Sequence, residues 1–290
     1  MKKSIVIGLV QHAADRDREI CFDRSCSGIA AAAAQGAECI VLQELHGGVY
    51  FCQSMEEPFF DWAESIPGPS TERFAKLAKQ HQVVLVLSLF ERRMAGVYHN
   101  TAVVIEKDGS IAGIYRKMHI PDDPGFCEKY YFTPGDLGFN PIKTSVGNLG
   151  VMVCWDQWFP EAARAMALAG ADVLIYPTAI GWIPVDDLAT QQKQRDAWIT
   201  IQRSHAIANA LPVVVCNRTG IEAHPHYSEQ HIQFWGSSFI AGVQGEILAE
   251  AAVDTDQVLV QKLDLSRTEK IRRLWPFLRD RRVEYYDNEY

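Results

Sequence analysis

The chain alternates short apolar runs with longer amphipathic or alanine-rich stretches. The short runs, rich in Val, Ile and Leu, predict strands, and the longer stretches predict helices. We expect strands over residues 4–11, 38–43, 83–90, 98–106, 111–116, 149–154, 172–177, 212–217, 234–241 and 257–263, and helices over 16–35, 70–81, 160–169 and 188–210. This alternation predicts an α/β fold with helices packed outside sheets.

At least one pair of neighbouring strands should be antiparallel. Lys107-Asp-Gly109 separates two strand-like runs, and Asp-Gly favours the positive φ angles of a hairpin turn. The sheets are therefore expected to be mixed, which disfavours a pure Rossmann fold and a pure barrel. No repeat, linker or low-complexity segment interrupts the pattern, so we expect one domain over residues 1–290.

Composition narrows the class of protein. Of the 290 residues 48% are apolar, which allows a large core, and the net charge of −8 disfavours nucleic acid but suits a cationic small molecule. The seven cysteines form no Cys-x-x-Cys pair, which is typical of a reducing compartment. The first apolar run is too short for a signal peptide, and no run approaches the length of a membrane span. We therefore expect a cytoplasmic protein with no membrane partner.

The end of the chain, residues 275–290, carries four aromatic residues beyond Trp275 together with several arginines. Two interpretations are open: a solvated terminus, or a segment that packs on a neighbouring subunit. The second interpretation predicts a homo-oligomer.

The strongest local feature is Gly150-Val-Met-Val-Cys154, an apolar strand that ends at a cysteine shortly before an expected helix start at Pro160. A nucleophile at a sharp strand-to-helix turn is exposed at the sheet edge, where backbone N–H groups meet a developing oxyanion. Cys154 is therefore a candidate nucleophile. The alternative is a small buried core residue.

Two other strand ends offer the groups that a thiol nucleophile needs. Val41-Leu-Gln-Glu44 ends in a carboxylate, and Ile114-Tyr-Arg-Lys117 ends in a cation. A free cysteine is mostly protonated at neutral pH, so its neighbours must activate it. Because strand ends of a layered α/β sheet gather at one edge, we expect Glu44, Lys117 and Cys154 to meet there.

Three blocks of the sequence resemble the signature blocks of the nitrilase superfamily, which is built on a Glu–Lys–Cys triad. They are Gln43-Glu44, Tyr115-Arg-Lys-Met-His-Ile-Pro121 and Cys154-Trp-Asp-Gln-Trp-Phe-Pro-Glu161. The resemblance covers essentially the whole chain and implies a four-layer α-β-β-α sandwich with mixed sheets. Trp155 and Trp158 stand where many members have Tyr and Arg, which resembles the branch that acts on N-carbamoylputrescine.

The resemblance also implies a role for each residue. Glu44 is expected to be the general base for the nucleophile Cys154. Lys117 is expected to favour the thiolate and, with the backbone N–H of Trp155, to stabilise the oxyanion. Glu128 falls where the family often carries a second glutamate that orients the lysine and the substrate; the alternative is a loop surface charge. No cofactor is expected.

The substrate is expected to be cationic. Two acidic pairs, Asp122-Asp123 and Asp186-Asp187, follow strands near the predicted active edge, where a carboxylate pairs with the ammonium of a diamine derivative. A ureido acid would instead need arginine, and adjacent acids in loops are otherwise simply solvated. An apolar channel for a four-carbon chain is expected from Tyr50, Phe126 and Trp182.

The expected reaction is hydrolysis of N-carbamoylputrescine to putrescine, carbon dioxide and ammonia through a thioester-type intermediate on Cys154. Within the superfamily the alternatives are an N-carbamoyl amino acid hydrolase and an ω-amidase. Outside it, a Cys–His hydrolase and a catalytically silent assembly protein are the alternatives. His224-Pro-His226 with His231 is expected to be a surface segment rather than a metal site.

Overall fold

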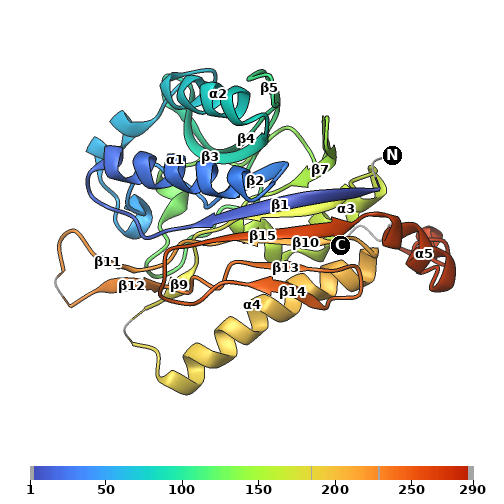
Figure 1. Ribbon diagram of the computed structural model, residues 1–290. Helices are drawn as coiled ribbons and strands as arrows, with labels where there is room; N and C mark the ends of the chain where they lie inside the picture. The colour runs from blue at the N-terminus through green and yellow to red at the C-terminus, as the bar shows by residue number, and fades with distance from the viewer. Residues whose placement is uncertain (1–2, 184, 228, 287–290) are drawn as a thin grey trace.

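Two six-stranded mixed sheets lie face to face and carry helices on their outer sides (Figure 1). The computed structural model describes residues 3–183, 185–227 and 229–286. The first sheet has the order β15-β1-β2-β3-β4-β5. Its strands are β1 (Ser4–Gln11), β2 (Cys39–Leu42), β3 (Val84–Met94), β4 (Val97–Ile105), β5 (Ile111–Arg116) and β15 (Gln257–Asp264).

The second sheet has the order β14-β13-β10-β8-β7-β6. Its strands are β6 (Ile142–Thr144), β7 (Gly147–Val151), β8 (Val173–Pro177), β10 (Val213–Cys216), β13 (Phe239–Ala241) and β14 (Ile247–Glu250). A small third sheet joins β11 (Ile221–Ala223), β12 (His231–Phe234) and β9 (Gly181–Trp182). In both large sheets the central strands β2 and β10 are entirely apolar and are buried on both faces.

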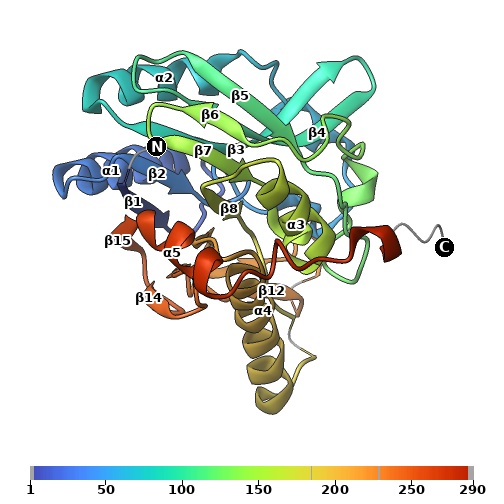
Figure 2. The same ribbon diagram turned by 90° about the vertical axis from the view of Figure 1, so that its right-hand side faces the viewer.

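Helices α1 (Arg18–Ala34) and α2 (Pro69–His81) cover the first sheet, and α3 (Pro160–Leu168) and α4 (Leu188–Asn209) cover the second (Figures 1 and 2). One core cluster lies between the sheets and under α3 and α4, and another lies between the first sheet and α1 and α2. Helix α5 (Ser266–Leu274) follows β15. The predicted α-β-β-α layering with mixed sheets is therefore confirmed.

Local signals explain where these helices begin and end. Asp17 caps α1 by accepting the Glu19 N–H at 2.9 Å. Helix α2 begins with Pro69 in its first turn and ends before Gln82, which has a left-handed φ of 54°. The hairpin at Gly109, where φ is 90°, joins antiparallel β4 and β5 as predicted.

The run over residues 234–241 was expected to form one strand, and this prediction is wrong. Gly236 and Ser237 have φ angles of 50° and 49°, which turn the chain between β12 and β13. The predicted strand over 149–154 ends at Val151, and Cys154 belongs to a short 3₁₀ helix. The pattern also missed β6, β9, β11, β14 and α5.

Candidate active site

The carboxyl ends of β2, β5 and β7 bring three predicted residues together. Lys117, directly after β5, donates from Nζ to Glu44 Oε1 at 2.8 Å and to Glu128 Oε2 at 2.6 Å. Glu44 lies two residues beyond β2, and Cys154 lies three residues beyond β7. All four side chains are buried. The cluster therefore contains a thiol, an ammonium group and two carboxylates shielded from bulk water.

Cys154 occupies a strained turn between strand and helix. Its φ is 44°, a left-handed value that non-glycine residues rarely adopt. It opens the 3₁₀ helix Cys154–Trp158, and Pro160 then starts α3. Because the first N–H groups of a helix lack intrahelical partners, the N–H of Trp155 is available to an oxyanion. The sharp turn predicted at this cysteine is present.

Asp156 ties this turn to the segment that carries Lys117. Its Oδ2 accepts the Val153 N–H at 3.0 Å and the Tyr115 hydroxyl at 2.9 Å. Its Oδ1 accepts the backbone N–H of His119 at 3.0 Å. Tyr115 and His119 flank Lys117 in the chain, so one buried carboxylate fixes the turn at Cys154 relative to Lys117.

Glu44 has one oxygen bound and one oxygen open. Besides Lys117, the amide Nδ2 of Asn100 donates to Glu44 Oε1 at 2.7 Å. Asn100 is itself held by Ser88, whose hydroxyl lies 3.1 Å from Asn100 Oδ1. Glu44 Oε2 is buried and has no hydrogen-bond partner within the described residues. This oxygen is therefore free to accept a proton.

Burial dominates the electrostatics of the cluster. It raises the pKa of the Cys154 thiol well above its ordinary value, Glu44 adds to the rise, and Lys117 opposes it. Burial alone lowers the pKa of Lys117, but Glu128 and Glu44 outweigh it and raise that pKa well above its ordinary value. Burial also raises the pKa of Glu128 to about 7 against the opposing effect of Lys117. The resting state therefore pairs a neutral thiol with a charged lysine.

A cleft of about 390 Å³ opens onto Cys154. Its lining includes the carboxyl residues Asp123, Glu128 and Asp186 and, among the described residues, neither Lys nor Arg. Its apolar part comes mainly from Pro121, Pro124, Phe126, Trp155, Trp158, Ile180, Ile183 and Trp235. Such a surface suits a molecule with an apolar middle and a positive end.

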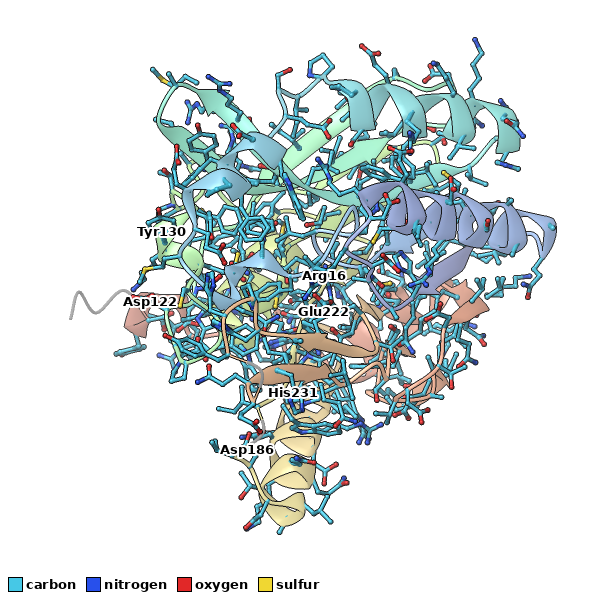
Figure 3. All side chains as sticks on the ribbon, turned by 90° about the vertical axis from the view of Figure 1, so that its left-hand side faces the viewer. Arg16, Asp122, Tyr130, Asp186, Glu222 and His231 are labelled. Carbon is cyan, nitrogen blue, oxygen red and sulfur yellow. The ribbon has the colours of Figure 1, made fainter. Side chains whose placement is uncertain are left out.

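Of the residues expected to bind substrate, Asp123, Phe126 and Asp186 line this cleft. The other four residues do not line it; they are Tyr50, Asp122, Trp182 and Asp187. Asp122 is exposed in the loop after β5, on the same side of the molecule as Asp186 (Figure 3). Tyr50 is buried, and its hydroxyl donates to Glu128 Oε1 at 2.7 Å.

Asp187 and Trp182 have structural contacts instead. Asp187 caps α4 by accepting the Thr190 N–H at 2.7 Å. The indole Nε1 of Trp182 donates to the Gln191 carbonyl at 2.9 Å, and its ring packs against Trp235.

Sequence reasoning assigned no role to Asn100 or Asp156. Asn100 is a polar residue inside a run predicted to be a buried strand, and a buried amide there requires a partner. Asp156 lies two residues after Cys154, between Trp155 and Gln157 and outside every predicted strand and helix. Asn100 was therefore detectable as a polar group at a position where the pattern demands burial, whereas the sequence around Asp156 carries no such signal.

Within residues 3–183, 185–227 and 229–286, no three His, Cys, Asp or Glu side chains gather to hold a metal ion. Near His231, the ring Nδ1 of His224 accepts the His226 N–H at 3.1 Å. No helix in the part of the chain that the structure describes is long and apolar enough to cross a membrane.

Comparison with known proteins identifies the family to which this chain belongs. The chain matches the carbon-nitrogen hydrolase family over residues 6–273. It is similar to the N-carbamoylputrescine amidase of Solanum lycopersicum, with 46% identity over 89% of this chain and 85% of that protein. A citrullinase of Francisella tularensis is 42% identical over 90% of this chain and 89% of that protein.

The fold comparison agrees with the sequence comparison. The crystal structure of a carbon-nitrogen hydrolase from Helicobacter pylori G27 matches with a TM-score of 0.95 and 53% identity. The match covers 98% of this chain and 97% of that one. Because the family match covers nearly the whole chain, the protein belongs to the carbon-nitrogen hydrolases of the nitrilase superfamily and is an enzyme that hydrolyses non-peptide C–N bonds of small molecules.

Proposed function

We propose that this enzyme hydrolyses N-carbamoylputrescine to putrescine, carbon dioxide and ammonia. The observation that carries the proposal is the cleft, which joins a buried thiol to a wall bearing Asp123 and Asp186 and, among its described lining residues, neither Lys nor Arg. N-carbamoylputrescine has a ureido group at one end and an ammonium group at the other. The names of the plant relatives at 43–46% identity support the same substrate.

In the proposed mechanism Cys154 is the nucleophile and Glu44 is the general base. Oε2 of Glu44 takes the thiol proton as Sγ attacks the ureido carbon, and the C=O electron pair moves onto oxygen. Lys117 and the Trp155 N–H stabilise the resulting oxyanion. The tetrahedral intermediate then collapses: the C–N bond breaks, the proton on Glu44 passes to the leaving amine, and a thiocarbamate remains on Cys154.

Water completes the reaction. Glu44 takes a proton from water as its oxygen attacks the thiocarbamate carbon, and the same two donors stabilise the second oxyanion. The C–S bond breaks, and Sγ recovers its proton from Glu44. If ammonia leaves first, the released carbamate of putrescine decarboxylates to putrescine. Glu128 holds Lys117 in place throughout, since it accepts a second hydrogen bond from Nζ at 2.6 Å.

Ammonia release across a substrate panel tests the assignment. N-carbamoylputrescine, citrulline, ureidopropionate, N-carbamoyl amino acids and short amides are compared, with Cys154→Ala as the inactive control. We expect N-carbamoylputrescine to have the highest kcat/KM, because the α-carboxylate of citrulline and the carboxylates of ureido acids find no cation in the described lining. A higher kcat/KM for a ureido acid than for N-carbamoylputrescine would contradict this assignment.

The acids of the cleft provide a matched pair of variants. Asp186→Asn removes a carboxylate that lines the cleft, whereas Asp187→Asn keeps a good helix cap and lies outside it. We expect Asp186→Asn to raise KM for N-carbamoylputrescine roughly tenfold, because a charged hydrogen bond contributes about 1.5 kcal/mol or more. Asp187→Asn should leave KM unchanged. Equal KM values in both variants would contradict a role for Asp186.

We also propose a homo-oligomer and a cytoplasmic location. The oligomer is supported by the exposed apolar side chains around the end of α5, namely Leu274, Trp275 and Phe277. Of the aromatic tail over residues 275–290, residues 287–290 lie outside the described residues. A reducing compartment is supported by the cysteines of the described residues, which form no disulfide.

A further inference from the structure

The turn that carries Glu44 is held by a buried arginine from the other sheet. Arg218 lies two residues beyond β10, and its side chain is fully buried. Its Nη2 donates to the carbonyls of Glu44 at 2.7 Å and Leu45 at 3.0 Å. Its Nη1 lies 3.3 Å from the carbonyl of Gly48. One guanidinium group therefore fixes the backbone at the start and at the end of this turn.

Glu222 links Arg218 to Glu128, the second carboxylate of the site, through Tyr50. It accepts a hydrogen bond from Arg218 Nη1 at 2.7 Å. Its other oxygen accepts the backbone N–H of Tyr50. The Tyr50 hydroxyl in turn donates to Glu128 at 2.7 Å. The ion pair is thus linked to Glu44 through a carbonyl and to Glu128 through Tyr50, and both carboxylates bind Lys117.

Neither member of the pair lines the cleft that opens onto Cys154. Glu222 lies at a separate cleft of about 610 Å³, which it lines together with Arg16 (Figure 3). A buried ion pair also stabilises a fold poorly, because removing both charges from water offsets most of their attraction. Its contacts therefore point to placement of the catalytic groups rather than to substrate binding or to stability.

We propose that Arg218 and Glu222 are positioning residues that hold the carboxylates of Glu44 and Glu128 against Lys117. The proposal rests on the proposed role of Glu44 as the base for Cys154. With Arg218 removed, the Glu44 and Leu45 carbonyls lose their donor, and Leu45, whose φ of 47° is left-handed, loses part of what holds it in that conformation.

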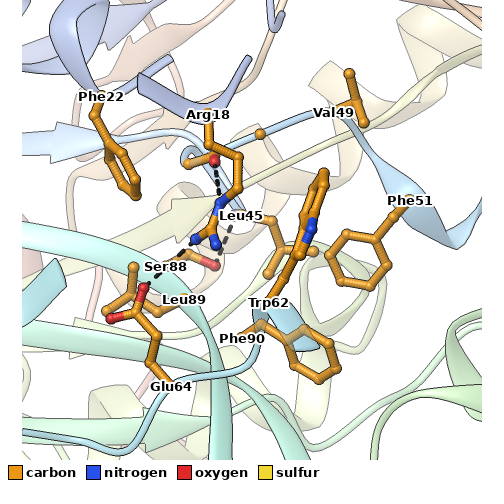
Figure 4. Close-up of a pocket in the computed structure, with 12 residues that line it drawn as sticks. Arg18, Phe22, Leu45, Val49, Phe51, Trp62, Glu64, Ser88, Leu89 and Phe90 are labelled. Atoms are coloured by element: carbon orange, nitrogen blue, oxygen red, sulfur yellow. Dashed lines mark hydrogen bonds and ion pairs between the residues drawn. The ribbon is translucent and has the colours of Figure 1, made fainter. Parts of the chain in front are cut away.

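Arg18 offers a matched control, because it binds a different carbonyl of the same turn. Its Nε donates to the Gly47 carbonyl at 3.1 Å, and its guanidinium lies near Glu64 and over the rings of Phe22 and Trp62 (Figure 4). Its side chain is 31% exposed. Arg18 therefore shares the turn and the charge of Arg218 but reaches neither Glu44 nor Tyr50 in the contacts of the described residues.

The test measures the rate at which iodoacetamide alkylates Cys154, together with kcat, KM and the melting temperature. Alkylation depends on removal of the thiol proton and not on the identity of the natural substrate. We expect Arg218→Met to slow alkylation and lower kcat by about 100-fold, the effect typical of an ångström-scale displacement of a catalytic group. Arg218→Lys and Glu222→Gln should each lower both rates about tenfold, with KM changed less than kcat.

Two controls separate positioning from stability. Arg18→Met should alkylate at the wild-type rate, and Leu85→Ala, a core change under α1 and α2, should lower the melting temperature without slowing alkylation. If Arg218→Met does not fold, Arg218→Lys and Glu222→Gln decide the matter. Wild-type alkylation in these two variants, or equal slowing in Leu85→Ala, would overturn the proposal. Wild-type alkylation in Glu44→Gln would instead overturn the role of Glu44 itself.

Discussion

Lys117 is enclosed by two carboxylates, and its contribution to stability follows from that enclosure. Its side chain is fully buried, with Glu44 and Glu128 at 2.8 and 2.6 Å. Lys117→Met leaves both carboxylates in the core without a cation, so we expect the free energy of unfolding to fall by about 3–5 kcal/mol at pH 8. Urea denaturation measures this loss.

The pH dependence of this loss has a definite sign. Lys117 lowers the pKa of Glu128, so without the cation that pKa rises above about 7 and this carboxylate takes up a proton as the pH falls. In the wild type the pKa of Lys117 is raised above its ordinary value, so its stabilising effect persists through neutral pH and is lost only at higher pH. The deficit of Lys117→Met should therefore be smaller at pH 5 than at pH 8. A deficit independent of pH would contradict this account of the cluster.

Tyr50 acts on the ionisation of Glu128. Burial raises the pKa of Glu128 to about 7, and the Tyr50 hydroxyl lowers it by donating to the charged form. Activity that needs a charged Glu128 beside Lys117 falls as pH drops through this value. Tyr50→Phe removes the donor, so we expect the acid limb of kcat/KM to move to higher pH.

A pH profile of kcat/KM for the wild type and Tyr50→Phe measures this shift. Tyr131→Phe is the matched control, since Tyr131 is also buried but its hydroxyl bonds the backbone of Ser54 at 2.8 Å rather than a carboxylate of the site. Its acid limb should coincide with that of the wild type. Superimposable profiles for all three proteins would rule out Glu128 as the titrating group.

At the scale of elements, the turn at Cys154 combines a strand end, a left-handed residue and a 3₁₀ helix. A φ of 44° costs a residue with a Cβ about 1–2 kcal/mol relative to glycine. Both Cys154→Ala and Cys154→Gly remove the thiol, so comparing them isolates the backbone. We expect Cys154→Gly to be more stable than Cys154→Ala by about 1 kcal/mol in chemical denaturation.

In helix α3, which follows this turn, glycine should have the opposite effect on stability. Ala163 lies inside α3 and is buried, so Ala163→Gly should be less stable than the wild type by about 1 kcal/mol. If glycine destabilises the protein at position 154 as it does at position 163, the turn at Cys154 is not strained.

The elements that carry Glu44, Lys117 and Cys154 were predictable because strands with apolar runs end one to three residues before them. The layered fold then brought the three ends to one edge, as expected. The short strands β6, β9 and β11 were not predictable, because two or three residues show no period. Helix α5 has no buried residue, and its nine residues include only two large apolar side chains, Ile271 and Leu274, too few to indicate a helix.

The substrate end of the site was predicted only in part, for a related reason. Residues 122 and 123 look alike in sequence, as do 186 and 187, yet only Asp123 and Asp186 line the cleft. Which member of each pair faces inward is set by the turn through Gly125, where φ is 82°, and by the capping of α4. Such choices depend on a helix start and a turn type that residue composition leaves open.

At the scale of the whole molecule, the segment after α5 runs across the side formed by α3 and α4 (Figure 2). Arg272, in the last turn of α5, anchors the start of this segment by donating to the Asn209 carbonyl at the end of α4 at 2.9 Å. Trp275 is 53% exposed and Phe277 is 45% exposed, and they are adjacent rings with centroids 6.0 Å apart. Apolar side chains grouped in this way are typical of a surface that a second subunit covers.

We therefore expect the double variant Trp275→Ala/Phe277→Ala to sediment as a smaller species than the wild type at the same micromolar concentration. Burial of aromatic side chains contributes most to subunit affinity, so its loss shifts the equilibrium toward monomer. Tyr227→Ala is the control, because Tyr227 is 59% exposed but lies in the loop between β11 and β12. If the wild-type protein sediments as a monomer, or if the double variant keeps the wild-type mass, this segment is solvated surface and not a subunit contact.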